Sequence, residues 1–300
     1  MKYTKNILGS LILLAISSAT YAQMAILSGP KQASQYRFVQ DIASIVGPSL
    51  DFEIVNTETL GAAANFDQLV DPKSPFKVAI IQSDFLYYMQ TQDMRLNTSK
   101  TKDLKVILPL GGQQIHLVTK ASKGYKGLKD LEKQKVAIGS VEQGTYRTAF
   151  LIKERSNVNW TAVNTHFEDA FGALNINDID AFFIVSSSPI EKLDVNPQTM
   201  VDKLALVPLV DFNDWAKYYK PDTIHKSEYK WLDNDIPTFS VPTVLVVNES
   251  KLQTEDDRNE IMKLRSAIQN NNEKLKTNGH PKWKEINLYE WTNSDWPMFK

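Results

Sequence analysis

One short stretch of the 300-residue sequence, VAIGSVEQGTY at residues 136–146, gives the clearest local indication of the fold. An apolar run ends at Gly139, a short loop follows, and a helix is predicted to begin near Gly144 and Thr145. Free amides at a helix N-terminus, together with the helix dipole, favour an anion such as a phosphate or a carboxylate. The spacing of the two glycines resembles a phosphate-binding loop, but Thr145 stands where such a loop has lysine, so no nucleotide site is expected. A plain strand-to-helix turn is the alternative.

The same succession of a short apolar run and a segment with helical periodicity recurs on both sides of this stretch. Continuous apolar runs predict buried, largely parallel strands at 24–28, 52–56, 78–81, 104–108, 115–119, 135–139, 161–165 and 180–185. Helices are predicted at 34–46, 61–69, 83–92, 145–155 and 167–174, each soon after a strand. Beyond Pro208 we expect a strand at 238–248 and a long polar helix at 254–272, with Thr254 as its N-cap. The pattern is typical of the α/β class.

The length of the chain favours two lobes, because single domains run to roughly 100–200 residues. No low-complexity linker separates them, so the chain is expected to cross between lobes at strands, near residues 111–116 and again near 207–211. We therefore predict that residues 23–112 plus 211–300 form lobe 1 and residues 113–210 form lobe 2, each with its own sheet.

Composition narrows the possible functions. The chain has 34 Lys plus Arg against 35 Asp plus Glu, which offers no global positive field for nucleic acid. It contains no cysteine, and its four histidines lack the spacing of metal ligands. No pairing of a nucleophile with a base stands out either. We expect no metal, no cofactor, no nucleic-acid partner and no catalysis; a hydrolase is the weak enzyme alternative.

The first 22 residues have the organisation of a secretory signal peptide. Lys2 and Lys5 precede a short apolar run, and small residues follow up to Ala22. The apolar run is shorter than the roughly 20 residues needed to span a bilayer, which argues against a membrane anchor. The sequence predicts cleavage after Ala22 and a free, monomeric protein in the periplasm.

Three further strand-to-helix junctions, at 25–30, 80–84 and 185–189, also place polar side chains where a helix begins. Ligands of open α/β sheets bind at such carboxyl ends of strands, so we expect the four junctions to converge on one cleft. Arg37 could hold a carboxylate through its planar fork, or it could be a solvated surface charge. The candidate ligand-binding residues are Ser28, Tyr36, Arg37, Gln82, Ser83, Asp84, Gln143, Gly144, Thr145 and Ser187.

Several stretches occur in the order found in one protein family. They are ILSG at 26–29, AIIQSD at 79–84, GLKDL at 127–131, VAIGS at 136–140 with GT at 144–145, and IDAFF at 179–183. Over residues 24–190 the chain thereby resembles the TAXI-type solute-binding subunits of TRAP transporters, the TRAP-associated extracytoplasmic immunogenic proteins. Its C-terminal third is similar only loosely.

The resemblance implies a type II periplasmic-binding-protein fold, with two α/β lobes, a hinge and a ligand cleft between the lobes. It also implies capture of a small organic acid, an amino-dicarboxylate such as glutamate or an oxoacid, and its delivery to a TRAP membrane permease. By position, the family's binding motifs fall on Tyr36, Gln82, Asp84, Gly144, Thr145 and Ser187. The alternative in the same fold is the binding protein of an ABC importer, or a sensor receptor, for another small polar solute.

Overall fold

The computed structural model describes residues 22–195, 203–289, 291 and 296–300. The predicted signal peptide lies outside the described residues, except for Ala22, so its cleavage stays a prediction. Within the described part of the chain, no helix has both the length and the apolar character needed to cross a membrane.

In this part of the chain, ten strands and eight α-helices form a mixed α/β structure, which confirms the predicted class. The strands are β1 Gln23–Leu27, β2 Glu53–Thr57, β3 Val78–Gln82, β4 Leu104–Lys120, β5 Lys135–Ala137, β6 Thr161–Val163, β7 Ala181–Ser186, β8 Leu204–Leu206, β9 Lys220–Ile224 and β10 Ile236–Asn248. The helices are α1 Ser34–Asp41, α2 Ala62–Val70, α3 Ser83–Leu96, α4 Gly144–Ser156, α5 Phe167–Asn175, α6 Glu191–Val195, α7 Glu255–Asn270 and α8 Asn272–Asn278.

The sheet has parallel ends and an antiparallel centre. Its order is β2-β1-β3-β10-β4-β7-β5-β6, with β8 added on β4 and β9 on β10. Strands β1 to β3 pair in parallel, as do β5 to β7, whereas β10 is antiparallel to β3 and β4, and β4 to β7. We expected two separate sheets, but hydrogen bonds join these strands in one path because β4 and β10 are long enough to take part in both halves.

The strand β4 merges two strands that the sequence predicts separately, at 104–108 and 115–119. Glycines usually interrupt a strand, yet Gly111 and Gly112 lie inside this one. A Cβ at Gly111 would lie 2.8 Å from Ile286 Cγ1, and a Cβ at Gly112 would lie 2.7 Å from Ser240 Oγ. The two glycines therefore allow close packing in the middle of the strand and do not end it.

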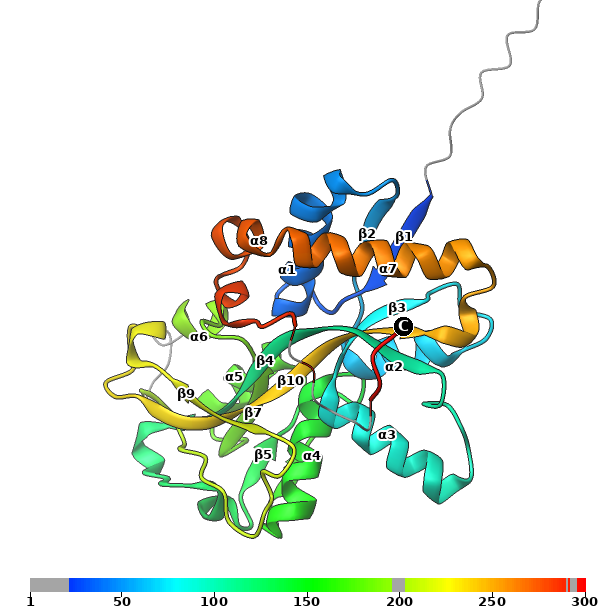
Figure 1. Ribbon diagram of the computed structural model, residues 1–300. Coiled ribbons are helices and arrows are strands. Elements are labelled where there is room, and N and C mark those ends of the chain that lie inside the picture. Colours follow the sequence, from blue (N-terminus) through cyan, green and yellow to red (C-terminus); the bar gives the residue numbers. More distant parts are fainter. Residues whose placement is uncertain (1–21, 196–202, 290, 292–295) are drawn as a thin grey trace, which may run out of the picture.

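Buried side chains divide the molecule into two halves. Strand β4 contributes residues up to Leu110 to clusters around β1–β3, and residues from Ile115 onward to clusters around β5–β7. Strand β10 divides in the same way, between Val241 and Val244. Figure 1 shows β4 and β10 side by side through the middle of the molecule, with β1–β3 and α7 on one side and β5, β7 and α4 on the other.

The chain therefore passes between the halves at 110–115 and at 241–244. The first passage overlaps residues 111–116, where a crossing between lobes is predicted. The second was predicted near 207–211 and lies elsewhere, because Val207, Leu209 and Trp215 pack with Phe239 in the second half. Strand β9 also pairs with the second-half part of β10. The predicted boundary at residue 210 thus falls inside the second half, and whether the halves move as lobes stays a prediction.

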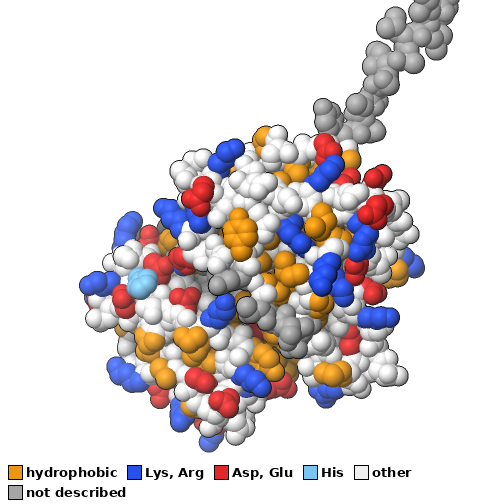
Figure 2. Space-filling view, in the orientation of Figure 1, with side chains coloured by type: hydrophobic (Ala, Val, Ile, Leu, Met, Phe, Trp, Pro, Cys, Tyr) orange, Lys and Arg blue, Asp and Glu red, His pale blue; other side chains and the backbone are white. Residues whose placement is uncertain are grey.

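Charged side chains are interspersed on the face shown in Figure 2, where acidic and basic groups alternate without a large area of one sign. This distribution matches the near-equal counts of 34 basic and 35 acidic residues. Any attraction of a charged solute must therefore come from local groups around a binding site.

Candidate functional site

A cavity of about 700 Å³ lies between the two halves. The first half lines it with residues between Pro30 and Gln35, between Leu60 and Ala62, and with Gln82. The second half contributes residues from the segments 137–145, 165–171, 182–186 and 190–192. All four predicted junctions supply lining residues. The junctions at 60–62 and 165–171 were missed as sites, although the same strand-then-helix pattern predicted their elements.

The helix α4 begins at the wall of this cavity without a capping side chain among the described residues. The N-cap residue Gln143 instead accepts a hydrogen bond at Oε1 from the Ser140 amide, at 3.0 Å. The Thr145 hydroxyl accepts a hydrogen bond from the Val185 amide at 3.1 Å, so its own hydrogen is free to be donated. The start of α4 thus presents main-chain amides and one hydroxyl donor to the cavity.

Gln82 and Gly144 bring the two halves into contact at the cavity. Gln82 is 1% exposed, and its Nε2 donates to Gln113 Oε1 at 2.9 Å. Its Oε1 is buried and has no hydrogen-bond partner among the described residues. A Cβ at Gly144 would lie 1.5 Å from that oxygen, so only glycine fits there. Gly61, with φ of 130°, approaches the Gln143 backbone in the same region.

Gln113 joins the polar groups at the first passage between the halves. Its Oε1 also accepts a hydrogen bond from Gln35 Nε2 at 2.8 Å, and its Nε2 donates to Ser34 Oγ at 3.0 Å. Sequence reasoning did not select this residue. The available signal was an amide side chain inside an otherwise apolar strand, because a buried amide needs partners.

Three predicted site residues of the first half do not line the cavity. Ser28 is buried and donates to Asn56 Oδ1 at 2.7 Å. Tyr36 is partly buried in α1 beside the lining residue Gln35. Arg37 is exposed and donates to Gln40 Oε1 at 3.2 Å, one turn along the same helix. The structure therefore places Arg37 as a surface charge and gives no support to a role as countercharge.

Asp84 and Ser83 are buried at the start of α3 and also lie outside the cavity lining. The Asp84 carboxyl accepts hydrogen bonds from Thr148 Oγ1 at 2.7 Å and from the Tyr219 hydroxyl at 3.3 Å, both in the second half. Burial raises the pKa of Asp84 to about 6, and these hydrogen bonds oppose the increase. Asp84 is thus a titratable contact between the halves.

Ser187 does not line the cavity, although the preceding residue, Ser186, does. Ser187 is 3% exposed, and its hydroxyl has no partner in the described part of the chain. The neighbouring Ser188 hydroxyl lies 3.0 Å from His116 Nε2, and the Tyr229 hydroxyl lies 2.9 Å from the same nitrogen. Burial lowers the pKa of His116 to about 4, which keeps the ring neutral at pH 7. No cluster of metal-ligating side chains occurs among the residues that the structure describes.

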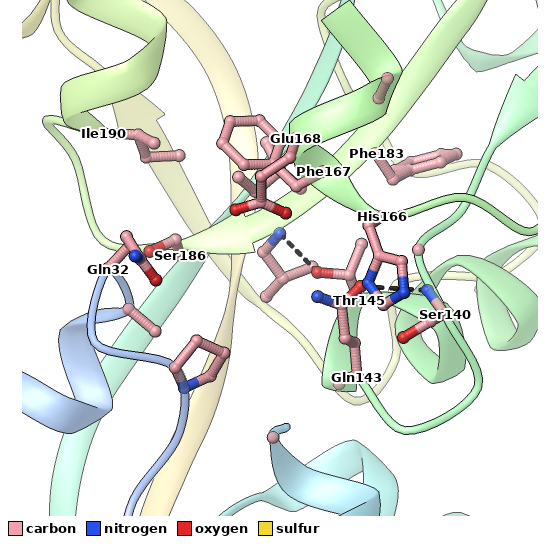
Figure 3. A pocket seen from close by; sticks show the side chains of 18 of the residues that line it. Gln32, Ser140, Gln143, Thr145, His166, Phe167, Glu168, Phe183, Ser186 and Ile190 are labelled. Atoms are coloured by element: carbon pink, nitrogen blue, oxygen red, sulfur yellow. Dashed lines mark hydrogen bonds between the residues drawn. The ribbon is translucent and has the colours of Figure 1, made fainter. Parts of the chain in front are cut away.

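Charged groups that sequence reasoning missed line the second-half wall. Lys192 Nζ donates to Glu168 Oε1 at 2.9 Å, and His166 and Glu191 lie nearby in the lining. Figure 3 shows the Glu168 carboxylate and the Thr145 side chain directed toward the same part of the cavity. Partial burial is the largest single effect on the pKa of Glu168 and acts to raise it. The hydrogen bond from Lys192, a main-chain hydrogen bond and the nearby positive charge together outweigh burial and lower that pKa.

Three solved structures with the same architecture are distant from this chain in sequence. An ancestral arginine-binding protein bound to arginine is 14% identical, with 88% of this chain and 96% of that chain covered and a TM-score of 0.53. A putative L-cystine ABC transporter protein from Listeria monocytogenes is 13% identical, with 93% and 99% covered and a TM-score of 0.51. The periplasmic sulfonate-binding protein of a putative ABC transporter from Methylobacillus flagellatus is 13% identical, with 92% and 75% covered and a TM-score of 0.51. These likenesses confirm the type II periplasmic-binding-protein fold.

Sequence comparison identifies the family. A search of curated proteins finds no match. A model of the NMT1-like family matches residues 26–296, and this family corresponds to the TAXI-type solute-binding proteins, so the stated resemblance is confirmed. The family is one of binding proteins and not of enzymes. Because the match spans most of its length, the chain belongs to the NMT1-like family and is a solute-binding protein of a transporter.

Proposed function

We propose that this protein captures a small organic acid in the cavity between its halves and delivers it to a TRAP-type membrane permease. The observation that carries the proposal is the uncapped start of α4, whose first residues, Gly144 and Thr145, line the cavity. The TAXI resemblance adds the expected class of solute, an amino-dicarboxylate such as glutamate or a related oxoacid.

The start of α4 suits a carboxylate for two reasons. Its main-chain amides lack intrahelical acceptors, and the helix dipole places about half a positive charge there. The Thr145 hydroxyl adds a donor whose oxygen is already oriented by the Val185 amide. Gln143 holds the loop in shape through the Ser140 amide.

We further propose that the two halves are lobes that close on the solute. The contacts of Gln82 with Gly144 and of Asp84 with Thr148 join the halves beside the cavity and would form on closure. Main-chain passages at 110–115 and 241–244 would act as the hinge. The second lobe would then run from about residue 113 to 241, in place of the 113–210 expected from the sequence.

The cellular setting is part of the proposal. A signal peptide at residues 1–22 would direct the chain to the periplasm, where it would act as a monomer without a cofactor. The fold is typical of extracytoplasmic binding proteins. A gene for a TRAP permease next to this one would support the partner, whereas a neighbouring transport ATPase or histidine kinase gene would favour the ABC importer or the sensor receptor.

Native mass spectrometry of protein purified without refolding tests the proposal, because tightly bound solute is often retained. We expect a small organic acid to co-purify. Thr145→Val should weaken its binding by roughly 10- to 100-fold, the range for one hydrogen bond to a charged group. Thr277→Val, on α8 and outside the cavity, is the matched control. A retained solute without an acidic group, or equal binding by both variants, would contradict the carboxylate site.

A further inference from the structure

We infer that the preferred solute is a monocarboxylate with an aromatic or branched apolar body, and that the cavity disfavours a second carboxylate. This inference rests on the proposed function, because it assumes that one carboxylate binds at the start of α4. It departs from the dicarboxylate that the family resemblance suggests, and it follows from the wall of the cavity that faces α4.

That wall is built from phenylalanines. The rings of Phe167, Phe171 and Phe182 pack edge to face or tilted, with centroids 5.1 to 6.0 Å apart, and all three residues line the cavity. Ile190 continues the wall, as Figure 3 shows. Leu60 lines the cavity from the other half and is 56% exposed, which is high for a leucine. Phe182 and Phe171 are buried behind Phe167, so Phe167 and Leu60 present the apolar surface that an apolar group of the solute would cover.

The cavity lining leaves no lysine or arginine free for a second carboxylate. Among the described residues that line it, Lys192 is the only lysine or arginine, and Glu168 already accepts its hydrogen bond at 2.9 Å. Glu191 adds a further negative charge at the same wall. An additional anion there would meet two carboxylates and one neutralised ammonium, and desolvating it without a partner is costly.

Other basic side chains near the cavity are engaged elsewhere. The Arg147 guanidinium lies 3.9 Å from the centroid of the Tyr88 ring, which holds it between α3 and α4. Lys31 pairs with Glu58 at 3.5 Å. Neither residue lines the cavity. The main-chain amides of α4 are therefore the anion contact, and they have room for one carboxylate.

The size of the cavity fits the same solute. Glutamate and 2-oxoglutarate are small compared with about 700 Å³, a volume within the range of pockets for drug-sized ligands. A ring or branched chain would occupy the space between Leu60 and Phe167. With a small dicarboxylate bound, water would remain in that space.

Three 2-oxo acids with the same head group test the inference by titration calorimetry: pyruvate, phenylpyruvate and 2-oxoglutarate. The matching amino acids, alanine, phenylalanine and glutamate, form a parallel series. We expect phenylpyruvate or phenylalanine to bind about 70-fold more tightly than its methyl counterpart, for roughly 100 Å² of ring surface removed from water. The corresponding dicarboxylate should bind more weakly than the aromatic acid.

Two variants test the two parts of the wall. Phe167→Leu should reduce the preference for phenylpyruvate over pyruvate by about tenfold, and Phe212→Leu, which lies outside the cavity, should leave the ratio unchanged.

Glu168→Gln frees Lys192 and should improve 2-oxoglutarate binding relative to pyruvate by about tenfold. Glu273→Gln removes a comparable surface partner, from Lys276, and is its control. Because each readout is a ratio between ligands, a general loss of folded protein does not mimic it.

The outcomes separate this inference from the proposed function. A dicarboxylate that binds as tightly as the aromatic acid would overturn the inference and leave carboxylate capture intact. Affinity ratios between ligands that stay unchanged in Phe167→Leu and Glu168→Gln would also overturn the inference and leave carboxylate capture intact. No binding by any of the six acids to the folded protein would overturn both the inference and carboxylate capture.

Discussion

Gly144→Ala tests the contact between the halves more directly than any other single substitution. The added Cβ would lie 1.5 Å from Gln82 Oε1 and 2.5 Å from its Cδ. Gln82 cannot move freely, because it is 1% exposed and its Nε2 donates to Gln113. Either that hydrogen bond breaks or the halves separate. Overpacking of a buried contact costs about 1–3 kcal/mol, and a broken buried hydrogen bond costs a similar amount.

The alanine also has a small effect that opposes this loss of stability. Replacing a glycine by alanine in a compatible backbone conformation stabilises the folded protein by about 0.4–1 kcal/mol. We therefore expect urea unfolding to show a net loss of roughly 1–2 kcal/mol. If the clash instead separates the halves, small-angle scattering should show a larger radius of gyration, and solute affinity should fall by about 5- to 150-fold for the same 1–3 kcal/mol.

Gly172→Ala is the matched control, because this glycine lies within α5 and a Cβ there would meet no atom within 4 Å. It should stabilise by about 0.5–1 kcal/mol through helix propensity alone. The double variant Gly144→Ala/Gln82→Ala removes the clash and should recover most of the loss, which appears as a coupling energy in the double-mutant cycle. Equal stability, scattering and affinity of Gly144→Ala and Gly172→Ala would refute the close contact.

Three further predictions concern stability. Burial raises the pKa of Asp84 to about 6, so the free energy of unfolding should fall by about 3 kcal/mol as pH rises from about 4 to 6. Burial lowers the pKa of His116 to about 4, so the free energy of unfolding should fall by about 3 kcal/mol as pH drops from about 6.5 to 4. The two effects oppose each other in the parent between about pH 4 and 6. Asp84→Asn and His116→Gln should therefore show pH slopes of opposite sign in urea unfolding, and slopes of the same sign would count against this. Thr254→Ala should cost about 1 kcal/mol by removing the N-cap of α7, and no change in thermal unfolding would contradict that cap. Asn65→Leu should cost more than about 2 kcal/mol, because the Asn65 side chain donates at 2.6 Å to the carbonyl of Ser28, just after β1, and at 2.8 Å to the carbonyl of Ile80 within β3. An unchanged melting temperature would argue that water replaces these hydrogen bonds.

The parts of the fold that could be predicted depend on neighbours in the sequence. Continuous apolar runs predicted β1, β3, β5 and β7, because a strand buried on both faces needs apolar side chains at every position. Thr254 was predicted as an N-cap and is confirmed, since its hydroxyl accepts a hydrogen bond from the Asp257 amide at 3.1 Å. Such features are decided within a few residues of the chain.

The features that could not be predicted depend on residues far apart in the sequence. Local reasoning treats Gly111 as a break, whereas the structure needs it because Ile286, from the C-terminal segment, packs against it. Strand β9, Lys220–Ile224, has a polar sequence and forms through its pairing with the edge of β10. Neither partner can be identified from periodicity.

The candidate site shows the same division. The start of α4 could be located because a strand, a glycine loop and a helix follow one another within residues 136–146. The position of Arg37 on α1 could also be predicted, but the direction of its side chain depends on how the helix packs, and it points to solvent. Lys192 on α6 and Glu168 on α5 form an ion pair although they are 24 residues apart in the sequence. No local sequence pattern indicates this pairing.

In the proposed site, the anion contact and the selectivity come from different kinds of groups. The proposed carboxylate contact uses main-chain amides at the start of α4, which substitutions of side chains leave largely in place. The opposite wall consists of side chains from α5, β7 and α6, such as Phe167 and Lys192, which can change without altering the course of the chain. A binding protein built in this way can exchange one acidic solute for another through its wall while it keeps the carboxylate contact and the fold. The identity of the family consequently predicts the class of head group better than it predicts the rest of the solute.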